Sequence, residues 1–166
     1  LLQSSAASDV YKRQVLIETF KKHNSLKRLV LYSCTSSYPC KFEDVSLLEI
    51  IRIKEKYEEH IKDIGFSGHH LGIAVDIASY ALGANWIERH FTLDRTFKGT
   101  DHIASLEPTG LRKLCRDLHA TKQSLKYKDS DILHCEIFQN YYLKSCLLYT
   151  SDAAVVWCCV VVGGGG

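Results

Sequence analysis

The stretch that decides the fold, Gly65–Pro108, reads GFSGHHLGIAVDIASYALGANWIERHFTLDRTFKGTDHIASLEP. It contains four of the eight histidines of the chain, His69, His70, His90 and His102. A long apolar segment separates the first two histidines from the third. Polar clusters that alternate with apolar segments are typical of a site built at the ends of buried strands.

The composition indicates a soluble globular protein. The 166 residues, 46% hydrophobic and 24% charged, are enough for one domain with its own core. A net charge of +2 gives no electrostatic reason to expect nucleic acid or a membrane as partner. Apolar runs are shorter than the roughly 20 residues of a membrane helix, and no secretory signal pattern begins the chain. We therefore expect a cytoplasmic protein.

The seven cysteines show no paired metal-ligand spacing. Free thiols in a reducing compartment are the favoured interpretation. A structural zinc site made by Cys34, Cys40 and a distant histidine is the weaker alternative, because zinc ligands usually come in short pairs.

Segments near the two ends of the chain are related to each other through the genetic code. Residues 9–14, DVYKRQ, can be encoded by a sequence whose reverse complement encodes CLLYTS, which is residues 146–151. Such an inverted repeat is typical of a translated sequencing adapter, and residues 155–166 use only Val, Trp, Cys and Gly. We therefore expect residues 1–14 and 146–166 to be adapter and read-end translation rather than protein.

Between these ends, hydrophobic periodicity predicts alternating helices and strands. A helix should end within Val15–His23, and a helix capped by Ser46, with Glu49 completing a capping box, should follow the first strand. An apolar, well-buried helix should cover Gly72–Leu82 and stop at Gly83. Pro108 should lie near the start of the last helix. The predicted strands are Lys27–Ser33, Ile64–Ser67 and Asn85–Phe91.

A helix followed by three strand-helix units predicts an α/β fold with a parallel sheet. Periodicity alone leaves open a barrel or an open, doubly wound sheet, both of which bind ligands at the carboxyl ends of their strands.

Two histidines, His69 and His90, lie at the ends of neighbouring predicted strands. Strands about 4.8 Å apart allow such side chains to converge on one divalent metal. The alternative is that both histidines are hydrogen-bonded polar residues at strand ends. Glu88 shares a strand face with His90, so it is either functional or part of an ion pair. Asp101 is either a substrate-binding carboxylate or an ordinary loop residue.

Six motifs together resemble the sialic acid synthase (N-acetylneuraminate synthase) family, over roughly residues 29–125. They are CTSSYP (Cys34–Pro39), FEDV (Phe42–Val45), GFSGHH (Gly65–His70), LGA (Leu82–Ala84), ERHFTLDRT (Glu88–Thr96) and KGTDHIASLEP (Lys98–Pro108).

This resemblance implies a (β/α)8 TIM barrel followed by a small antifreeze-like domain. The chain would then be a partial barrel with a preceding helix and strands six to eight, in residues 15–125, and residues 126–145 would link it to the missing domain. The family condenses phosphoenolpyruvate with N-acetylmannosamine or a related amino sugar, releases phosphate, and uses Mn²⁺ or Mg²⁺. The complete protein is expected to be a homodimer, and the fragment alone is expected to be inactive.

The resemblance also implies roles for individual residues. Glu88 would position the sugar or the attacking water, and Asp101 would bind sugar hydroxyls, so these two are the expected catalytic residues. Tyr38 would contact the sugar. Phosphoenolpyruvate would be bound by Ser67, and by Ser36, which stands where many members have asparagine. His69 and His90 would be the metal ligands, and His70 would be structural.

Gly68-His70 departs from the Ser-Asp-His-Thr pattern of bacterial members, and animal-type members also have glycine at the first of these positions. Two alternatives remain. One is a synthase for another nonulosonic acid (legionaminic, pseudaminic or a 9-phosphate form). The other is a non-catalytic module whose histidines are hydrogen-bonded in its core.

Overall fold

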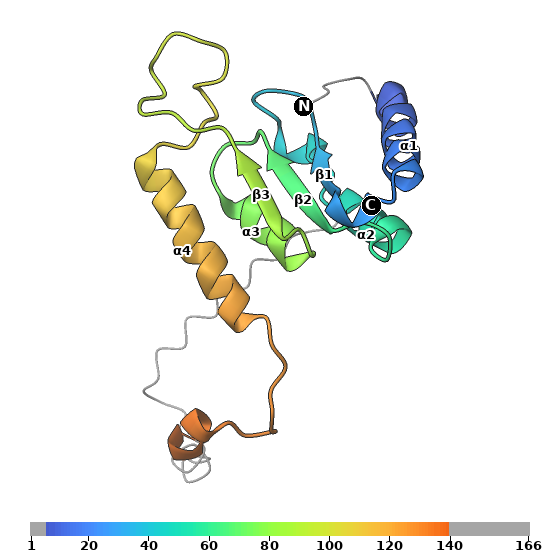
Figure 1. The fold of residues 1–166 in the computed structure, drawn as a ribbon. Coiled ribbons are helices and arrows are strands. Elements are labelled where there is room, and N and C mark those ends of the chain that lie inside the picture. The colour runs from blue at the N-terminus through green and yellow to red at the C-terminus, as the bar shows by residue number, and fades with distance from the viewer. Residues whose placement is uncertain (1–5, 140–166) are drawn as a thin grey trace, which may run out of the picture. The chain divides into compact units, whose positions relative to one another are not determined.

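The computed structural model describes residues 6–139, which divide after Leu125 into two compact units. The first unit is an α/β structure, in which helices alternate with the strands of one parallel sheet (Figure 1). Its helices are α1 (Ala6–Lys22), α2 (Glu49–Tyr57), α3 (Ala74–Ala81) and α4 (Pro108–Ser124), and its strands are β1 (Val30–Cys34), β2 (Asp63–Gly68) and β3 (Trp86–Arg89).

The sheet has three parallel strands in the order β1-β2-β3. In its register, Ser67 of β2 lies beside Cys34 of β1 and Glu88 of β3. All three strands therefore end at the same edge, as the alternation of helices and strands predicted. That they are strands six to eight of a barrel stays a prediction.

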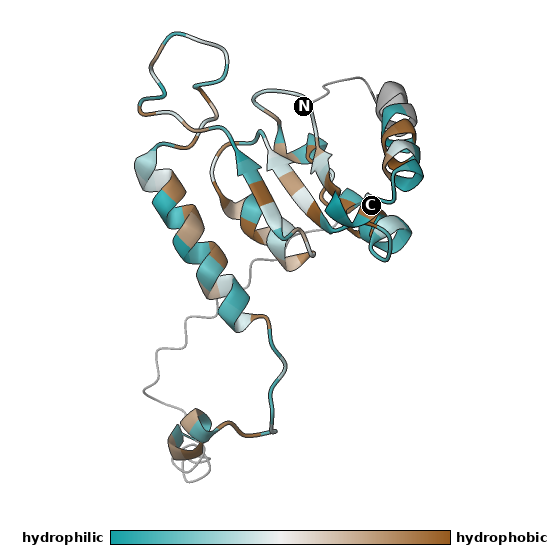
Figure 2. Ribbon diagram, viewed as in Figure 1, coloured by the Kyte–Doolittle hydropathy of each residue, from teal (hydrophilic) through white to brown (hydrophobic). Residues whose placement is uncertain are grey.

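The core lies where the sheet meets its helices. Ile50 and Ile53 of α2 are buried against Ile64 and Phe66 of β2 and against Leu31 of β1. Helix α2 carries its charged residues on the other side, so its hydropathy changes across the helix (Figure 2). This amphipathic pattern is what holds the helix on the sheet.

The predicted capping box of α2 is wrong. The helix begins at Glu49, and no side chain caps it. Ser46 has a left-handed backbone with φ 53°, and its carbonyl accepts the Glu49 N–H at 3.0 Å. The Glu49 carboxylate instead pairs with Arg52, 2.7 Å away. A tight backbone turn thus replaces the side-chain cap.

Helix α3 is not the uniformly buried apolar helix that its composition predicted. Its fully buried residues are the polar Asp76 and Ser79, whereas its apolar residues are half-buried or exposed. The Ser79 hydroxyl donates to the Asp76 carbonyl at 2.8 Å, and the Asp76 carboxylate faces Arg89 of β3. Polar groups with such partners can be buried. Gly83, with φ 107°, follows the helix as predicted.

Two other elements differ little from expectation. Helix α1 ends at Lys22, with lysines in its last turn. The first strand is shorter than predicted, because Leu26–Arg28 form a 3₁₀ turn before it. Since α1 begins at Ala6, it includes residues that we assigned to adapter translation, and the domain boundaries stay a prediction.

In the second unit, the described residues 126–139 contain one 3₁₀ turn, His134–Glu136. The Glu136 carboxylate accepts hydrogen bonds from Lys128 Nζ and from the Leu133 N–H, both at 2.8 Å. The hydrogen bond from Lys128 lowers the pKa of Glu136 most, and the bond from Leu133 lowers it further. Residues 146–166, which we expect to be translated adapter and read-end sequence, lie outside the described residues. Among residues 6–139, no helix is long and apolar enough to cross a membrane.

The packing of α2 predicts a stability difference between Ile50 in the helix and Leu48, the residue just before it. Ile50→Ala should lower the free energy of unfolding by about 2–5 kcal/mol, because Ile50 is fully buried. Leu48→Ala, at a side chain that is 70% exposed, should change it by less than about 0.5 kcal/mol. Urea unfolding followed by circular dichroism measures both, and equal effects would contradict the packing described.

Candidate functional site

The two predicted metal ligands lie together at the carboxyl edge of the sheet. His69 directly follows β2 and His90 directly follows β3, and Gly68 pairs with Arg89 in the register. The ring centroids of His69 and His90 are 5.2 Å apart, with the rings nearly perpendicular. The convergence expected from strand order is therefore present.

His69 is buried and its ring is held by the backbone of the first loop. Its Nδ1 lies 2.8 Å from the Thr35 carbonyl oxygen. Because a carbonyl only accepts, Nδ1 is the protonated nitrogen of the neutral ring, and in that tautomer Nε2 has the lone pair. A carbonyl that fixes the ring in this way is the usual outer partner of a metal-binding histidine. The donor set thus fits a metal, although no group of three or more potential ligands is preassembled among residues 6–139.

Tyr38 lies between the histidine pair and the loop after β3. Its ring centroid is 4.8 Å from that of His90 and 5.5 Å from that of His69. Its hydroxyl donates to the Asp101 carbonyl and lies 3.1 Å from Ser105 Oγ. This contact joins two segments 63 residues apart in the sequence.

Ser67 and Glu88 face each other on neighbouring strands. The Ser67 hydroxyl donates to Glu88 Oε1 at 2.8 Å, and Ser67 is buried. Together with burial, the charge of Glu88 raises the pKa of Tyr32 on β1. The carboxylate therefore lies on the site face of the sheet, as the alternation along β3 predicted.

The remaining predicted residues are more exposed. The Asp101 side chain is 63% exposed, and its Oδ2 lies 3.8 Å from His90 Nδ1. Its loop is fixed at the base, where the Leu106 N–H donates to the His90 carbonyl at 2.8 Å. Ser36 is exposed in the loop after β1, two residues before Tyr38. The structure thus places four further predicted side chains, Tyr38, Ser67, Glu88 and Asp101, at the strand ends that carry His69 and His90, and it places Ser36 in the adjoining loop.

A buried polar cluster on the other face of β3 was missed by sequence reasoning. Arg89, whose side chain is 3% exposed, pairs with the fully buried Asp76, and its Nη1 lies 3.2 Å from His70 Nε2. A single carboxylate in an otherwise apolar helix was the available signal, because a buried charge requires a partner.

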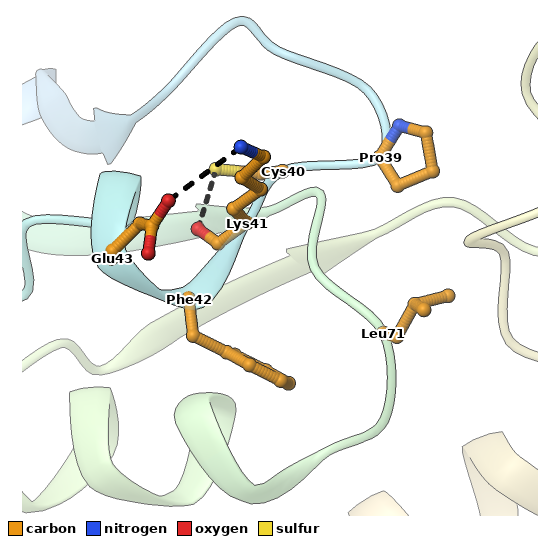
Figure 3. Close-up of a pocket in the computed structure, with 6 residues that line it drawn as sticks. All are labelled: Pro39, Cys40, Lys41, Phe42, Glu43 and Leu71. Carbon is orange, nitrogen blue, oxygen red and sulfur yellow. Dashed lines mark hydrogen bonds and ion pairs between the residues drawn. The ribbon is translucent and has the colours of Figure 1, made fainter.

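An apolar hollow of about 360 Å³ lies beside the site (Figure 3). It is lined by Pro39, Cys40, Lys41, Phe42, Glu43 and Leu71. None of these is a residue predicted for the synthase site, and Cys40 was named only for the alternative zinc site. The Cys40 N–H donates to the His69 carbonyl at 2.8 Å. Burial raises the pKa of the Cys40 thiol, with smaller contributions from Asp44 and Cys34. The four cysteines of the described part of the chain form no disulfide.

The NeuB family model matches residues 2–130, most of the chain. The chain belongs to the NeuB family. The match covers β1, β2 and β3 and every predicted site residue.

Relatives of known name point to the same family. The chain is 45% identical over 109 residues to the N-acetylneuraminate-9-phosphate synthase of Homo sapiens, and 36% identical over 137 residues to the N,N'-diacetyllegionaminic acid synthase of Legionella pneumophila. These alignments cover 64% and 79% of this NeuB chain, but only 29% and 38% of the two relatives. The chain therefore spans about a third of their length.

The solved structure of the N-acetylneuraminic acid (sialic acid) synthetase from Leptospira borgpetersenii is similar in fold, with a TM-score of 0.66 and 32% identity. The similarity covers 86% of this chain and 47% of that structure. It supports the α/β architecture and the sialic acid synthase resemblance of the sequence.

The environment of Cys40 predicts slow alkylation. At pH 8 iodoacetamide should modify Cys40 more slowly than the exposed Cys115 and Cys135, because a raised pKa lowers the thiolate fraction and burial limits access. Mass spectrometry of time-quenched digests measures the three rates. Alkylation of Cys40 as fast as that of Cys115 would show that the thiol is neither buried nor raised in pKa.

Proposed function

We propose that this NeuB chain is part of an N-acetylneuraminate synthase, which condenses phosphoenolpyruvate with N-acetylmannosamine and releases phosphate. The observation that carries the proposal is the 5.2 Å approach of the His69 and His90 rings. Tyr38 and Asp101 lie beside His90, and Glu88 is bonded to Ser67 at the adjoining strand ends. These residues match the motifs by which the sequence resembles the synthases.

A divalent ion, Mn²⁺ or Mg²⁺, held by His69 and His90 would act as a Lewis acid on the carbonyl of the open-chain sugar. The Thr35 carbonyl supports this role, since it holds His69 with Nε2 available for binding. The Asp101 carboxylate, near His90 Nδ1, would orient the second ring.

Ser67 and Glu88 would exchange partners when substrate binds. The Ser67 hydroxyl donates its hydrogen bond to Glu88 Oε1 in the free protein. With phosphoenolpyruvate bound, it would donate this bond to a phosphate oxygen instead. Glu88 could then hydrogen-bond to a sugar hydroxyl or to water. In the reaction, the enol carbon forms the new bond to the aldehyde carbon. The C=O π bond of the aldehyde opens as this bond forms, and its oxygen takes up a proton. Water then adds to the carbon that still bears the phosphate, and Glu88 would receive one proton of that water. The C–O bond to phosphate breaks, the remaining hydroxyl becomes the ketone oxygen, and phosphate leaves with the proton of that hydroxyl.

Tyr38 and Asp101 would bind the sugar. The Asp101 carboxylate is largely exposed at the rim and can accept hydrogen bonds from hydroxyls. The Tyr38 ring offers an apolar surface beside His90. Ser36, in the adjoining loop, would contribute a further hydroxyl to the phosphate.

A 9-phosphate product is the second candidate, because the human relative, 45% identical, is named an N-acetylneuraminate-9-phosphate synthase. Phosphoenolpyruvate adds three carbons ahead of the sugar, so carbon 6 of the sugar becomes carbon 9 of the product. The sugar substrate would then be N-acetylmannosamine 6-phosphate. Legionaminic or pseudaminic acid precursors are further options within the family, and a cytoplasmic homodimer remains our proposal for the complete protein.

The substrate proposal predicts an activity that depends on the complete reading frame. The complete protein, with Mn²⁺ and phosphoenolpyruvate, should release phosphate and form a nine-carbon acid with N-acetylmannosamine or its 6-phosphate. The 166-residue chain should not, because it spans about a third of its relatives. Phosphate release and product mass measure both. Robust turnover by the 166-residue chain would refute its inactivity, and no turnover of any amino sugar by the complete protein would refute the synthase.

The ligand assignment predicts a loss of metal affinity. His90→Ala in the complete protein should weaken Mn²⁺ binding by at least roughly 10–100-fold, since even the outer partners of metal ligands contribute that much. Isothermal titration measures the change, and His119→Ala, at an exposed residue of α4, is the matched control. Unchanged affinity in His90→Ala would remove His90 from the ligand set.

A further inference from the structure

The buried cluster of His70, Asp76 and Arg89 has no part in the chemistry proposed above. The side chains of His70 and Asp76 are fully buried, and that of Arg89 is 3% exposed. The three residues come from three segments: the loop after β2, helix α3 and the last position of β3. A charged cluster so deeply buried has to be explained by what it holds in place.

The Arg89 guanidinium is the centre of this cluster. Besides its ion pair with Asp76, it donates to the carbonyl oxygens of His70 at 2.7 Å, Gly72 at 2.8 Å and Ala104 at 3.3 Å. These donors belong to one rigid plane, so their acceptors are held in a fixed mutual arrangement. A lysine ammonium has no such fork.

The three carbonyls belong to the two segments that carry the site. The His70 carbonyl is one residue beyond His69, and Arg89 is one residue before His90. Ala104 precedes Ser105, whose hydroxyl contacts Tyr38 at 3.1 Å. One side chain therefore connects the two candidate metal ligands and the loop that contains Asp101.

Gly68 provides the space that the cluster occupies. A Cβ at Gly68 would lie 2.9 Å from Arg89 Cδ, 2.9 Å from Asp76 Oδ1 and 2.9 Å from His70 Cε1. Gly68 is also the register partner of Arg89 across the sheet. The absence of a side chain at Gly68 thus leaves room for the Arg89 side chain and its two partners on this face of the sheet.

Stability alone is a weak explanation for this arrangement. The cluster leaves His70 Nδ1, Asp76 Oδ1 and Arg89 Nε buried without a hydrogen-bond partner in the described structure. Buried ion pairs are often no more stabilising than apolar residues of similar volume, and their best-attested use is to specify geometry. The geometry specified here is the separation of the loop after β2 from the loop after β3.

We propose that Arg89 is a positioning residue that sets the distance between the His69 and His90 rings through the His70 and Ala104 carbonyls. The inference rests on the proposed function only in taking His69 and His90 as the two metal ligands. Because the Arg89 side chain is 3% exposed and lies on the face of β3 opposite Glu88, it would act through these two loops rather than on a ligand.

The test uses the 166-residue chain with ¹³C-labelled histidine, and its first readout needs no metal. The nuclear Overhauser cross-peak between the His69 and His90 rings, assigned with His69→Gln and His90→Gln, reports their separation. Arg89→Lys keeps the charge but loses the fork, Gly68→Ala pushes the guanidinium away, and Arg116→Met removes an exposed arginine paired with Asp117 on α4. Urea midpoints are recorded for every variant.

We expect the cross-peak to weaken about threefold in Arg89→Lys and Gly68→Ala, as for a loosening of about 1 Å, the scale at which a site loses its geometry. Arg116→Met should match the parent chain. In Arg89→Ala, millimolar guanidinium chloride should restore the cross-peak, whereas methylammonium should not.

A lower urea midpoint with an unchanged cross-peak in both variants would overturn the proposal, because Arg89 would then stabilise the fold without setting the ring distance. The absence of the cross-peak in the parent chain would overturn it also. The d–d absorption of added Co²⁺ provides the separate check on the metal site. If the parent chain shows no such bands while the cross-peak responds to Arg89, the metal proposal fails and the positioning role stands.

Discussion

The parallel register of β2 between its two neighbours is the constraint on which the site depends. With Ser67 beside both Cys34 and Glu88, the loop after β1, His69 and His90 must all leave the sheet at one edge. A slip of one residue in β3 would turn Glu88 and His90 toward α3 and bring Arg89 into the site, because side chains alternate along a strand. The register is fixed by burial on the opposite face, where Ile87 packs against the core and Arg89 meets Asp76.

Strand β3 therefore has two distinct environments within a few residues. Glu88 and His90 belong to the more exposed face. There Glu88 accepts a hydrogen bond from the Ser67 hydroxyl, and His90 lies beside the Tyr38 ring and the exposed Asp101 carboxylate. Arg89 belongs to a dry face and has its charge neutralised by Asp76. The two faces are nevertheless coupled. Glu88 and His90 flank Arg89 in the chain, so a displacement of the Arg89 backbone displaces both of them.

Sequence reasoning located the histidine pair because the features involved are local. Strand ends are marked by β-branched and apolar runs, and period two assigns Glu88 and His90 to one face without knowledge of the fold. It failed where a long-range partner decides the outcome. Asp76 was hidden in a helix of high average hydropathy, and its partner Arg89 lies in another segment. The capping box at Ser46 failed for a different, local reason, because the backbone there adopts a left-handed turn that the residue types do not indicate. The contact of Tyr38 with the loop around Asp101 needed the structure itself.

The residues of the site differ in how firmly they are held, and the difference suits the chemistry proposed for them. His69 is buried and its ring is fixed by Thr35, and Ser67 is buried and bonded to Glu88. Groups that must bind a metal or place a reacting carboxylate benefit from such rigidity, because an error of about 1 Å is enough to spoil the geometry. Asp101 and Ser36 lie on exposed loop segments, where hydroxyl-rich substrates can reach them. Since the Tyr38 hydroxyl bonds to the Asp101 carbonyl, the exposed carboxylate is still anchored to the rigid part through its backbone. The loop therefore presents an exposed side chain from an anchored main chain, and this combination would suit the sugar binding proposed for Asp101.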